Sequence, residues 1–270
     1  MDAGTMDARA AKPAGTSRGA RTSGLDRVLQ VLDHLQATGA PATAYEIAHR
    51  VGAPVSTIYV TVGDLVEKQL LARTGGNCVW FGPRLFHYGL AYARSVDLIG
   101  VATEEMHALA ASAGETVQVC GRDGDSMVVL AMAEGPGRFP VRSRVGTRVP
   151  LNWTASGRLL CGHLPLEERE AVFRRAAQAS PTGRAETDPA MLARASQAAL
   201  EARICVQAGE CDASVACVAA PILDHSGRCE ATISIVLPEE KAQRERAHFI
   251  AQVQQAARRI EERLGYRPLG

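Results

Sequence analysis

Hydrophobic positions in the first third of the chain repeat at steps of three and four residues, which is the spacing of one face of an α-helix. The first such run ends at Gly39, a residue type that commonly stops helices. The pattern predicts helices over residues 25–38, 44–51 and 54–68, followed by a β-hairpin over residues 70–81 around Gly75-Gly76-Asn77.

The pattern changes in the second part of the chain. Pro83 opens a helix to about residue 94, and an apolar stripe from Leu98 to Ala113 continues it after a bend near Asp97. From Gly114 onward, alternating apolar segments indicate strands that are interrupted by helical runs. We expect strands at 116–120, 127–133, 216–223 and 231–237, helices at 155–164, 167–178 and 188–202, and a last helix through residues 250–264.

Composition limits the class of protein. A chain of 270 residues with 46% hydrophobic residues suits two ordinary domains, each with a buried core. The formal net charge is +1, so the whole-chain charge indicates neither a nucleic acid nor a membrane as partner, and any basic patch must be local. Apolar stretches are shorter than the ~20 residues of a membrane span and the chain start lacks an apolar signal core, so we expect a cytoplasmic protein. Residues 1–23 predict a disordered basic tail.

Two of the expected helices, 44–51 and 54–68, have the spacing of a helix-turn-helix. Ala48 allows the helices to approach closely, Gly52 can adopt the positive φ of the turn, and Ile58 anchors the second helix to the core. The start of that second helix is then the part that contacts base edges in the major groove. The residues expected to face DNA are Ser56, Thr57, Tyr59, Val60 and Thr61 on the helix, and Arg73 and Asn77 on the hairpin. A three-helix bundle that serves dimerisation is the alternative for this region.

The seven cysteines predict thiols, since an odd number cannot pair completely within one chain. Cys205, Cys211 and Cys217 are spaced six residues apart, with no CxxC motif and no nearby histidine, so no zinc site is expected. We find no HExxH motif and no glycine-rich phosphate loop, and Thr154 replaces the first glycine of a Gly-x-Ser-x-Gly elbow at Ser156. The sequence therefore predicts no catalytic residue, no metal, no cofactor and no enzyme.

Six segments in chain order resemble the IclR family of bacterial transcription regulators: residues 25–29, 56–59, 81–85, 114–117, 145–158 and 218–235. The resemblance implies an α+β chain with a winged helix-turn-helix domain at 24–82, a linker helix at 83–96, and a GAF-like effector domain at 97–266. In that domain an antiparallel sheet is flanked by helices. It also implies homodimers or dimers of dimers that bind operator DNA and a small-molecule effector.

The resemblance places the effector pocket at the start of the helix that begins near residue 155, where Thr154 can act as the helix cap. The residues expected to contact the effector are Trp153, Ala155, Ser156, Gln207, Cys217 and Ser234. Trp153 stands where the family often has a smaller residue, and Gln207 where an aspartate is common. Val60 replaces a basic residue that most members carry. The change at Val60 predicts weaker or differently specified DNA binding, and Trp153 predicts a narrowed pocket mouth. Gln207, together with Val236 where some members have a second serine, makes the pocket less polar and predicts a more apolar effector, such as an aromatic or short-chain organic acid.

The sequence thus predicts a sequence-specific DNA-binding transcription regulator whose operator affinity is controlled by a small-molecule effector. The alternative is a ligand- or redox-sensing module that acts through cysteine chemistry or protein contacts without specific DNA binding.

Overall fold

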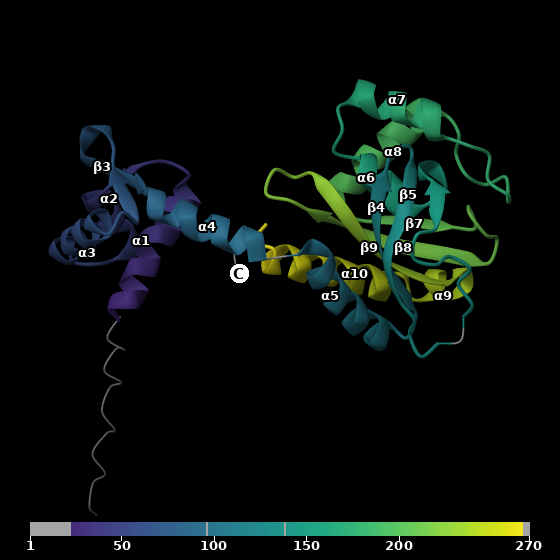
Figure 1. Ribbon diagram of the computed structural model, residues 1–270, viewed down its shortest axis with the longest axis horizontal. Helices are drawn as coiled ribbons and strands as arrows, with labels where there is room; N and C mark the ends of the chain where they lie inside the picture. Colours follow the sequence, from purple (N-terminus) through teal and green to yellow (C-terminus); the bar gives the residue numbers. More distant parts are fainter. Residues whose placement is uncertain (1–22, 96, 138, 267–270) are drawn as a thin grey trace, which may run out of the picture. The chain divides into compact units, whose positions relative to one another are not determined.

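The computed structural model describes residues 23–95, 97–137 and 139–266 (Figure 1). The predicted tail at residues 1–23 therefore lies, apart from Ser23, outside the described residues. The chain divides into two compact units, Met1–Tyr92 and Ala93–Gly270, which we call the N-terminal and C-terminal units. Each unit buries its own apolar side chains.

Three helices and a small sheet make up the N-terminal unit before its last helix. The helices are α1 (Gly24–Thr38), α2 (Ala44–Val51) and α3 (Val55–Glu67). The strands are β1 (Ala42–Thr43), β2 (Leu71–Arg73) and β3 (Cys78–Phe81), with the 3-10 turn η1 (Gly75–Asn77) between the last two. They form an antiparallel sheet in the order β1-β3-β2. The predicted helices and hairpin are confirmed, whereas β1 was not predicted because two residues show no alternation.

Local hydrogen bonds explain where the first two helices begin and end. Ser23 with Asp26, and Thr43 with Glu46, form reciprocal capping boxes at the starts of α1 and α2. Gly39 and Gly52 end these helices in the left-handed conformation that the turns require, and Gly39 is thus confirmed as the stop of the first helix.

Two helices follow the small sheet, as expected from the sequence. They are α4 (Pro83–Ser95) and α5 (Leu98–Ala113). The Asp97 carboxylate accepts hydrogen bonds from the backbone N–H groups of Ile99 and Gly100, so it caps α5 at the predicted bend. Across the described part of the chain, no helix has both the length and the apolar character that crossing a membrane requires.

A six-stranded antiparallel sheet is the centre of the C-terminal unit, with the strand order β6-β5-β4-β9-β8-β7. The strands are β4 (Thr116–Asp123), β5 (Ser126–Ala133), β6 (Arg148–Pro150), β7 (Cys205–Ala208), β8 (Val215–Leu223) and β9 (Cys229–Pro238). The four predicted strands are confirmed, and the antiparallel pairing confirms the expected fold class. The edge strands β6 and β7, of three and four residues, are not among these four.

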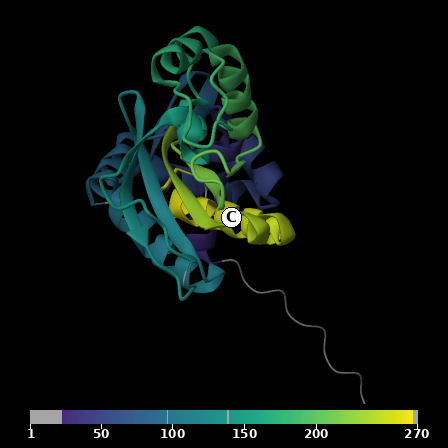
Figure 2. The same cartoon turned by 90° about the vertical axis from the view of Figure 1, so that its right-hand side faces the viewer.

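Helices cover both faces of this sheet (Figures 1 and 2). Besides α5, they are α6 (Ala155–Cys161), α7 (Leu166–Ala176), α8 (Pro189–Glu201), α9 (Glu239–Arg244) and α10 (Arg246–Arg263), with the 3-10 turn η2 (Leu151–Trp153) before α6. Because strand side chains alternate, Ile233 and Ile235 of β9 belong to the core under α5 and α10. Val236 of β9 and Cys217 of β8 belong to the opposite core with α6, α7 and α8. The candidate site lies on this second face.

Candidate functional site

The outer side of α3 presents the residues that the sequence predicts for DNA contact. Ser56, Thr57, Tyr59 and Val60 are exposed, and Thr61 is half-buried. Tyr59 is 53% and Val60 65% exposed, so both large side chains are accessible to a partner. The Thr61 hydroxyl donates to the Thr57 carbonyl at 2.9 Å, so it is engaged within the helix. The structure thus gathers these five residues on the first turns of α3.

The turn between α2 and α3 fixes the direction of this surface. Ala48 is 1% exposed where the helices meet, and its carbonyl accepts hydrogen bonds from the N–H groups of Gly52 and Ala53. Gly52 has a φ of 63°, and Ile58 is completely buried. The roles that the sequence assigned to these positions are confirmed, because each is needed to hold α3 with its polar side outward.

The hairpin of β2 and β3 carries the other two predicted residues. Arg73 is exposed at the end of β2. Asn77 is exposed in η1 and has a φ of 63°, a conformation that asparagine tolerates better than most residues. Both side chains therefore lie on the surface of this hairpin, which we call the wing.

The C-terminal unit contains a cavity of about 270 Å³ on the face of the sheet that packs against α6. Four of the six residues predicted for effector contact line it: Ser156, Gln207, Cys217 and Ser234. The sheet register brings three of them together, since Cys217 of β8 pairs with Gln207 of β7, and Ser234 lies on the neighbouring strand β9. Ser156 reaches the cavity from the start of α6, where Thr154 accepts a hydrogen bond from the Gly157 N–H as the predicted cap.

Trp153 and Ala155 do not line the cavity. The Trp153 indole N–H donates to the Gln178 carbonyl at 2.8 Å, so the ring is held by the loop after α7. Ala155 is fully buried in the core with Leu151 and Leu159. The expectation that these two side chains contact an effector is therefore corrected, because it is their neighbours Thr154 and Ser156 that line the cavity.

Sequence reasoning missed several residues of the cavity. Gln118 and Cys120 of β4 line it, and so does Arg142 in the segment between β5 and β6. The strand alternation from residue 116 onward was the available signal for the first two, since it places both on one face. Arg142 lies outside regular structure, and no periodic pattern could have indicated it.

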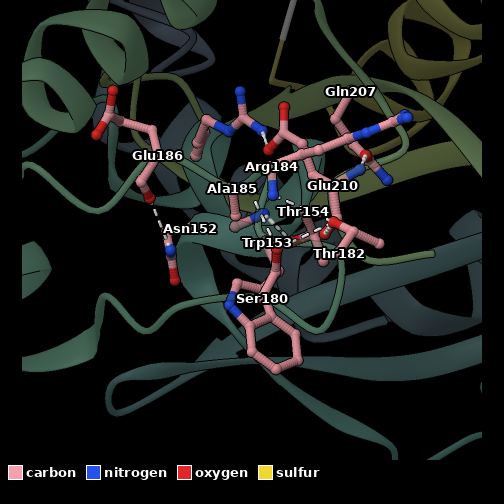
Figure 3. A network of polar contacts seen from close by, with 12 residues as sticks. Asn152, Trp153, Thr154, Ser180, Thr182, Arg184, Ala185, Glu186, Gln207 and Glu210 are labelled. Carbon is pink, nitrogen blue, oxygen red and sulfur yellow. Dashed lines mark hydrogen bonds and ion pairs between the residues drawn. The ribbon is translucent and has the colours of Figure 1, made fainter. Parts of the chain in front are cut away.

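Polar contacts tie the surroundings of the cavity together (Figure 3). The amide of the buried Asn152 donates to the carbonyls of Gln178 and Glu186 at 2.9 and 2.8 Å, and its oxygen accepts from the Gln178 N–H. Thr182 donates its hydroxyl to the Glu210 carbonyl at 2.7 Å. The loop between α7 and α8 is thus fastened both to η2 and to the β7–β8 loop.

Glu210 is held by a second element as well. Its backbone N–H donates to the Gln207 side-chain oxygen at 3.2 Å, and its carboxylate forms an ion pair with Arg158 of α6. Both charged side chains are largely buried, with 13% and 17% exposure. Since Cys211 and Asp212 directly follow Glu210 and line the cavity, this ion pair positions one side of the cavity.

The cavity floor is polar but uncharged. Burial raises the pKa of the Cys120 and Cys217 thiols to about 12, so both are protonated at neutral pH. The Ser156 hydroxyl oxygen is buried and has no hydrogen-bond partner. All seven cysteines are free thiols, as predicted. No three His, Cys, Asp or Glu side chains gather to hold a metal ion in the described ranges.

Comparisons with known proteins agree with this two-part organisation. The model of the IclR helix-turn-helix domain matches residues 24–75, and that of the bacterial transcriptional regulator IclR C-terminal domain matches residues 90–262. The HTH-type transcriptional repressor AllR of Salmonella typhi is 28% identical over 149 residues, which span about half of each chain, 55% of this one and 54% of the relative. AllR of Klebsiella pneumoniae is 26% identical over 251 residues, 90% of both chains.

Solved structures of IclR regulators have a fold similar to that of this chain. A putative IclR regulator from Silicibacter sp. TM1040 has a TM-score of 0.80 at 17% identity, covers 92% of this chain and 98% of its own, and shows the shared fold. An IclR homologue from Microbacterium hydrocarbonoxydans, solved with 4-hydroxybenzoate, has a TM-score of 0.55 at 26% identity. The match covers 90% of this chain and 99% of the homologue. These names describe transcriptional regulators and not enzymes. The model of the IclR C-terminal domain alone matches well over half of the residues of this chain, which therefore belongs to the IclR family of bacterial transcriptional regulators.

Proposed function

We propose that this chain is a repressor-type regulator that binds operator DNA through its N-terminal unit, with an affinity set by a small molecule in the cavity of the C-terminal unit. One observation carries the proposal. The same chain combines a recognition helix whose polar side is exposed with a separate domain whose cavity is lined by hydrogen-bonding side chains. The relatives named as repressors support the sign of the regulation.

The DNA contacts follow from the side chains on α3. The hydroxyl groups of Ser56, Thr57 and Tyr59 can hydrogen-bond base edges or phosphates, and the Val60 methyl groups suit contact with a thymine methyl. Arg73 and Asn77 on the wing would contact the backbone. Two such helices must meet major grooves ~34 Å apart, which requires a dimer. The exposed Phe86, Tyr88, Leu90 and Tyr92 on α4 support a homodimer or a dimer of dimers. Such a regulator acts in the cytoplasm, where the bacterial chromosome lies.

The cavity supports an organic acid or aromatic metabolite as the effector. Its lining combines apolar Met127, Val149 and Val236 with the hydroxyl groups of Ser156 and Ser234, a mixture typical of small-molecule sites. The homologue solved with 4-hydroxybenzoate supports the same class. The raised pKa values of the buried cysteines argue against the redox-sensing alternative, because a reactive cysteine needs a thiolate at neutral pH.

Fluorescence anisotropy with the chain's own promoter region, at two salt concentrations and with random DNA as competitor, tests the DNA-binding part. We expect specific binding that weakens steeply with salt. Ser56→Tyr should lower operator affinity about tenfold or more at unchanged melting temperature, because a bulky side chain there blocks the groove contact. Ser112→Tyr, an exposed serine on α5, is the matched control and should bind like the wild type. Equal binding of operator and random DNA by the folded protein, with or without organic acids present, would contradict the proposal.

A further inference from the structure

The segment between β5 and β6 forms one side of the cavity. Its residues 140–143 line the cavity in succession. The Ser143 hydroxyl accepts a hydrogen bond from the Gln118 side chain at 2.6 Å, so the floor strand β4 holds this segment in place. Arg144, the next residue, donates to the carbonyls of Val141 and Ser143 at 2.5 and 2.9 Å. The guanidinium of Arg144 is therefore bound to backbone carbonyls of its own segment, and Arg144 does not line the cavity.

Arg142 differs from its neighbour. Its side chain is exposed and lines the cavity, and it forms no hydrogen bond or ion pair with any residue that the structure describes. Arg158, the buried cation of α6, is paired with Glu210 and does not line the cavity. Among the described residues of the lining, Arg142 is thus the one positive charge, and no protein carboxylate neutralises it.

The lining also contains one negative charge, on the opposite side. Asp212 reaches the cavity from the β7–β8 loop, and its Oδ1 accepts hydrogen bonds from the N–H and hydroxyl of Ser214 at 3.2 and 3.1 Å. Asp212 forms no ion pair with Arg142 in the described structure. A ligand in the cavity therefore meets a cation on one loop and an anion on the other.

The floor between these loops favours an uncharged polar group. Ser156 is 1% exposed, and its buried hydroxyl faces the neutral Cys120 thiol, a weak hydrogen-bonding group, with no oxygen or nitrogen partner. Buried hydroxyl groups are usually paired, so this one is available to a ligand or a water molecule. Cys120 and Cys217 are neutral beside it, and no cation of the described lining lies on the floor strands. A ligand hydroxyl or carbonyl would satisfy Ser156, whereas a second carboxylate would find no counter-charge there.

We propose that Arg142 selects the effector by binding its single carboxylate, while the neutral end of the same molecule hydrogen-bonds Ser156 on the floor. The inference rests on the proposed function, since it names the residue that decides which ligands the cavity takes. A guanidinium binds a carboxylate through two parallel, charge-assisted hydrogen bonds, which are stronger than neutral ones. The effector class is therefore a monocarboxylate with a hydroxyl or carbonyl group at its far end.

Titration calorimetry on the full-length protein tests the inference with four probes: 4-hydroxybenzoate, its neutral amide 4-hydroxybenzamide, benzoate and pyruvate. We expect the wild type to bind at least one acid, and to bind 4-hydroxybenzoate about tenfold more tightly than the amide. Arg142→Gln should weaken binding of the acid to the level of the amide and leave binding of the amide unchanged. Arg142→Lys should recover part of the preference, and Asp212→Asn should tighten acid binding because it removes a like charge.

Arg174→Gln on α7 is the matched control, because it removes the same charge at an exposed side chain that does not line the cavity. It should bind the acids like the wild type, and melting temperatures verify that all variants are folded. If Arg142→Gln binds the acid as tightly as the wild type, or if Arg174→Gln loses as much affinity as Arg142→Gln, the inference is wrong while the effector function stands. If none of the four probes binds to the wild type, both this inference and the proposal of an organic-acid effector are wrong.

Discussion

Gly157 determines how closely the turn η2 can pack against α6. A Cβ atom at this position would lie 2.7 Å from the Leu151 Cα, closer than side-chain atoms approach backbone in proteins. We expect Gly157→Ala to lower the free energy of unfolding by about 1–3 kcal/mol, since the backbone beside Ser156 must move apart. Urea denaturation measures the change. In Gly89→Ala on α4, nothing lies within 4 Å of the added Cβ. That control should be stabilised by about 0.5–1 kcal/mol, and a neutral result for Gly157→Ala would show that η2 can shift freely.

The difference between Ser156 and Ala155 shows what sequence can indicate about single residues. The motif around residue 155 correctly located this wall of the cavity, but successive helix residues point about 100° apart, so only one of the two enters it. Trp153 does not line the cavity for a related reason. Its indole N–H donates to the carbonyl of Gln178, which lies 25 residues later in the chain. Side-chain direction depends on such distant partners, which a motif does not contain.

The ion pair between Arg158 on α6 and Glu210 in the β7–β8 loop connects two elements beside the cavity. Glu210→Gln leaves the largely buried guanidinium without a counter-charge, so we expect a loss of about 2–3 kcal/mol in the free energy of unfolding, below the range for fully buried pairs. Asp123→Asn, which breaks the exposed ion pair with Arg148, is the matched control and should change stability by less than about 0.5 kcal/mol. Urea denaturation of both variants measures the change in the free energy of unfolding. Equal losses in the two variants would contradict the structural role of the buried pair.

Elements could be predicted where they are long enough to show a period or where caps mark their ends. The helices α1 and α2 are bounded by capping boxes and glycines that are visible in the sequence. The strands β1 and β6 contain two and three residues, and a segment of that length has no measurable alternation. Both exist because a longer neighbouring strand offers hydrogen bonds to them.

At the scale of the whole molecule, the order of domains could be predicted because each unit buries its own apolar surface. The coupling between the two units could not be predicted, since in the proposed function it depends on how two copies of the chain are arranged on DNA. Thermodynamic linkage nevertheless constrains it, because an effector can shift the equilibrium only by its difference in affinity for the two states.

Linkage makes the proposed coupling measurable from both sides. If a bound monocarboxylate lowers operator affinity by some factor, operator DNA must lower the affinity for that acid by the same factor, and about 5- to 150-fold is usual. We therefore expect the dissociation constant of the acid that binds best in calorimetry to rise when saturating operator duplex is present. Ser56→Tyr retains the cavity but should lose DNA contact, so its affinity for the acid should not respond to operator. An affinity of the wild type that is equal with and without operator would contradict control of DNA binding through this cavity.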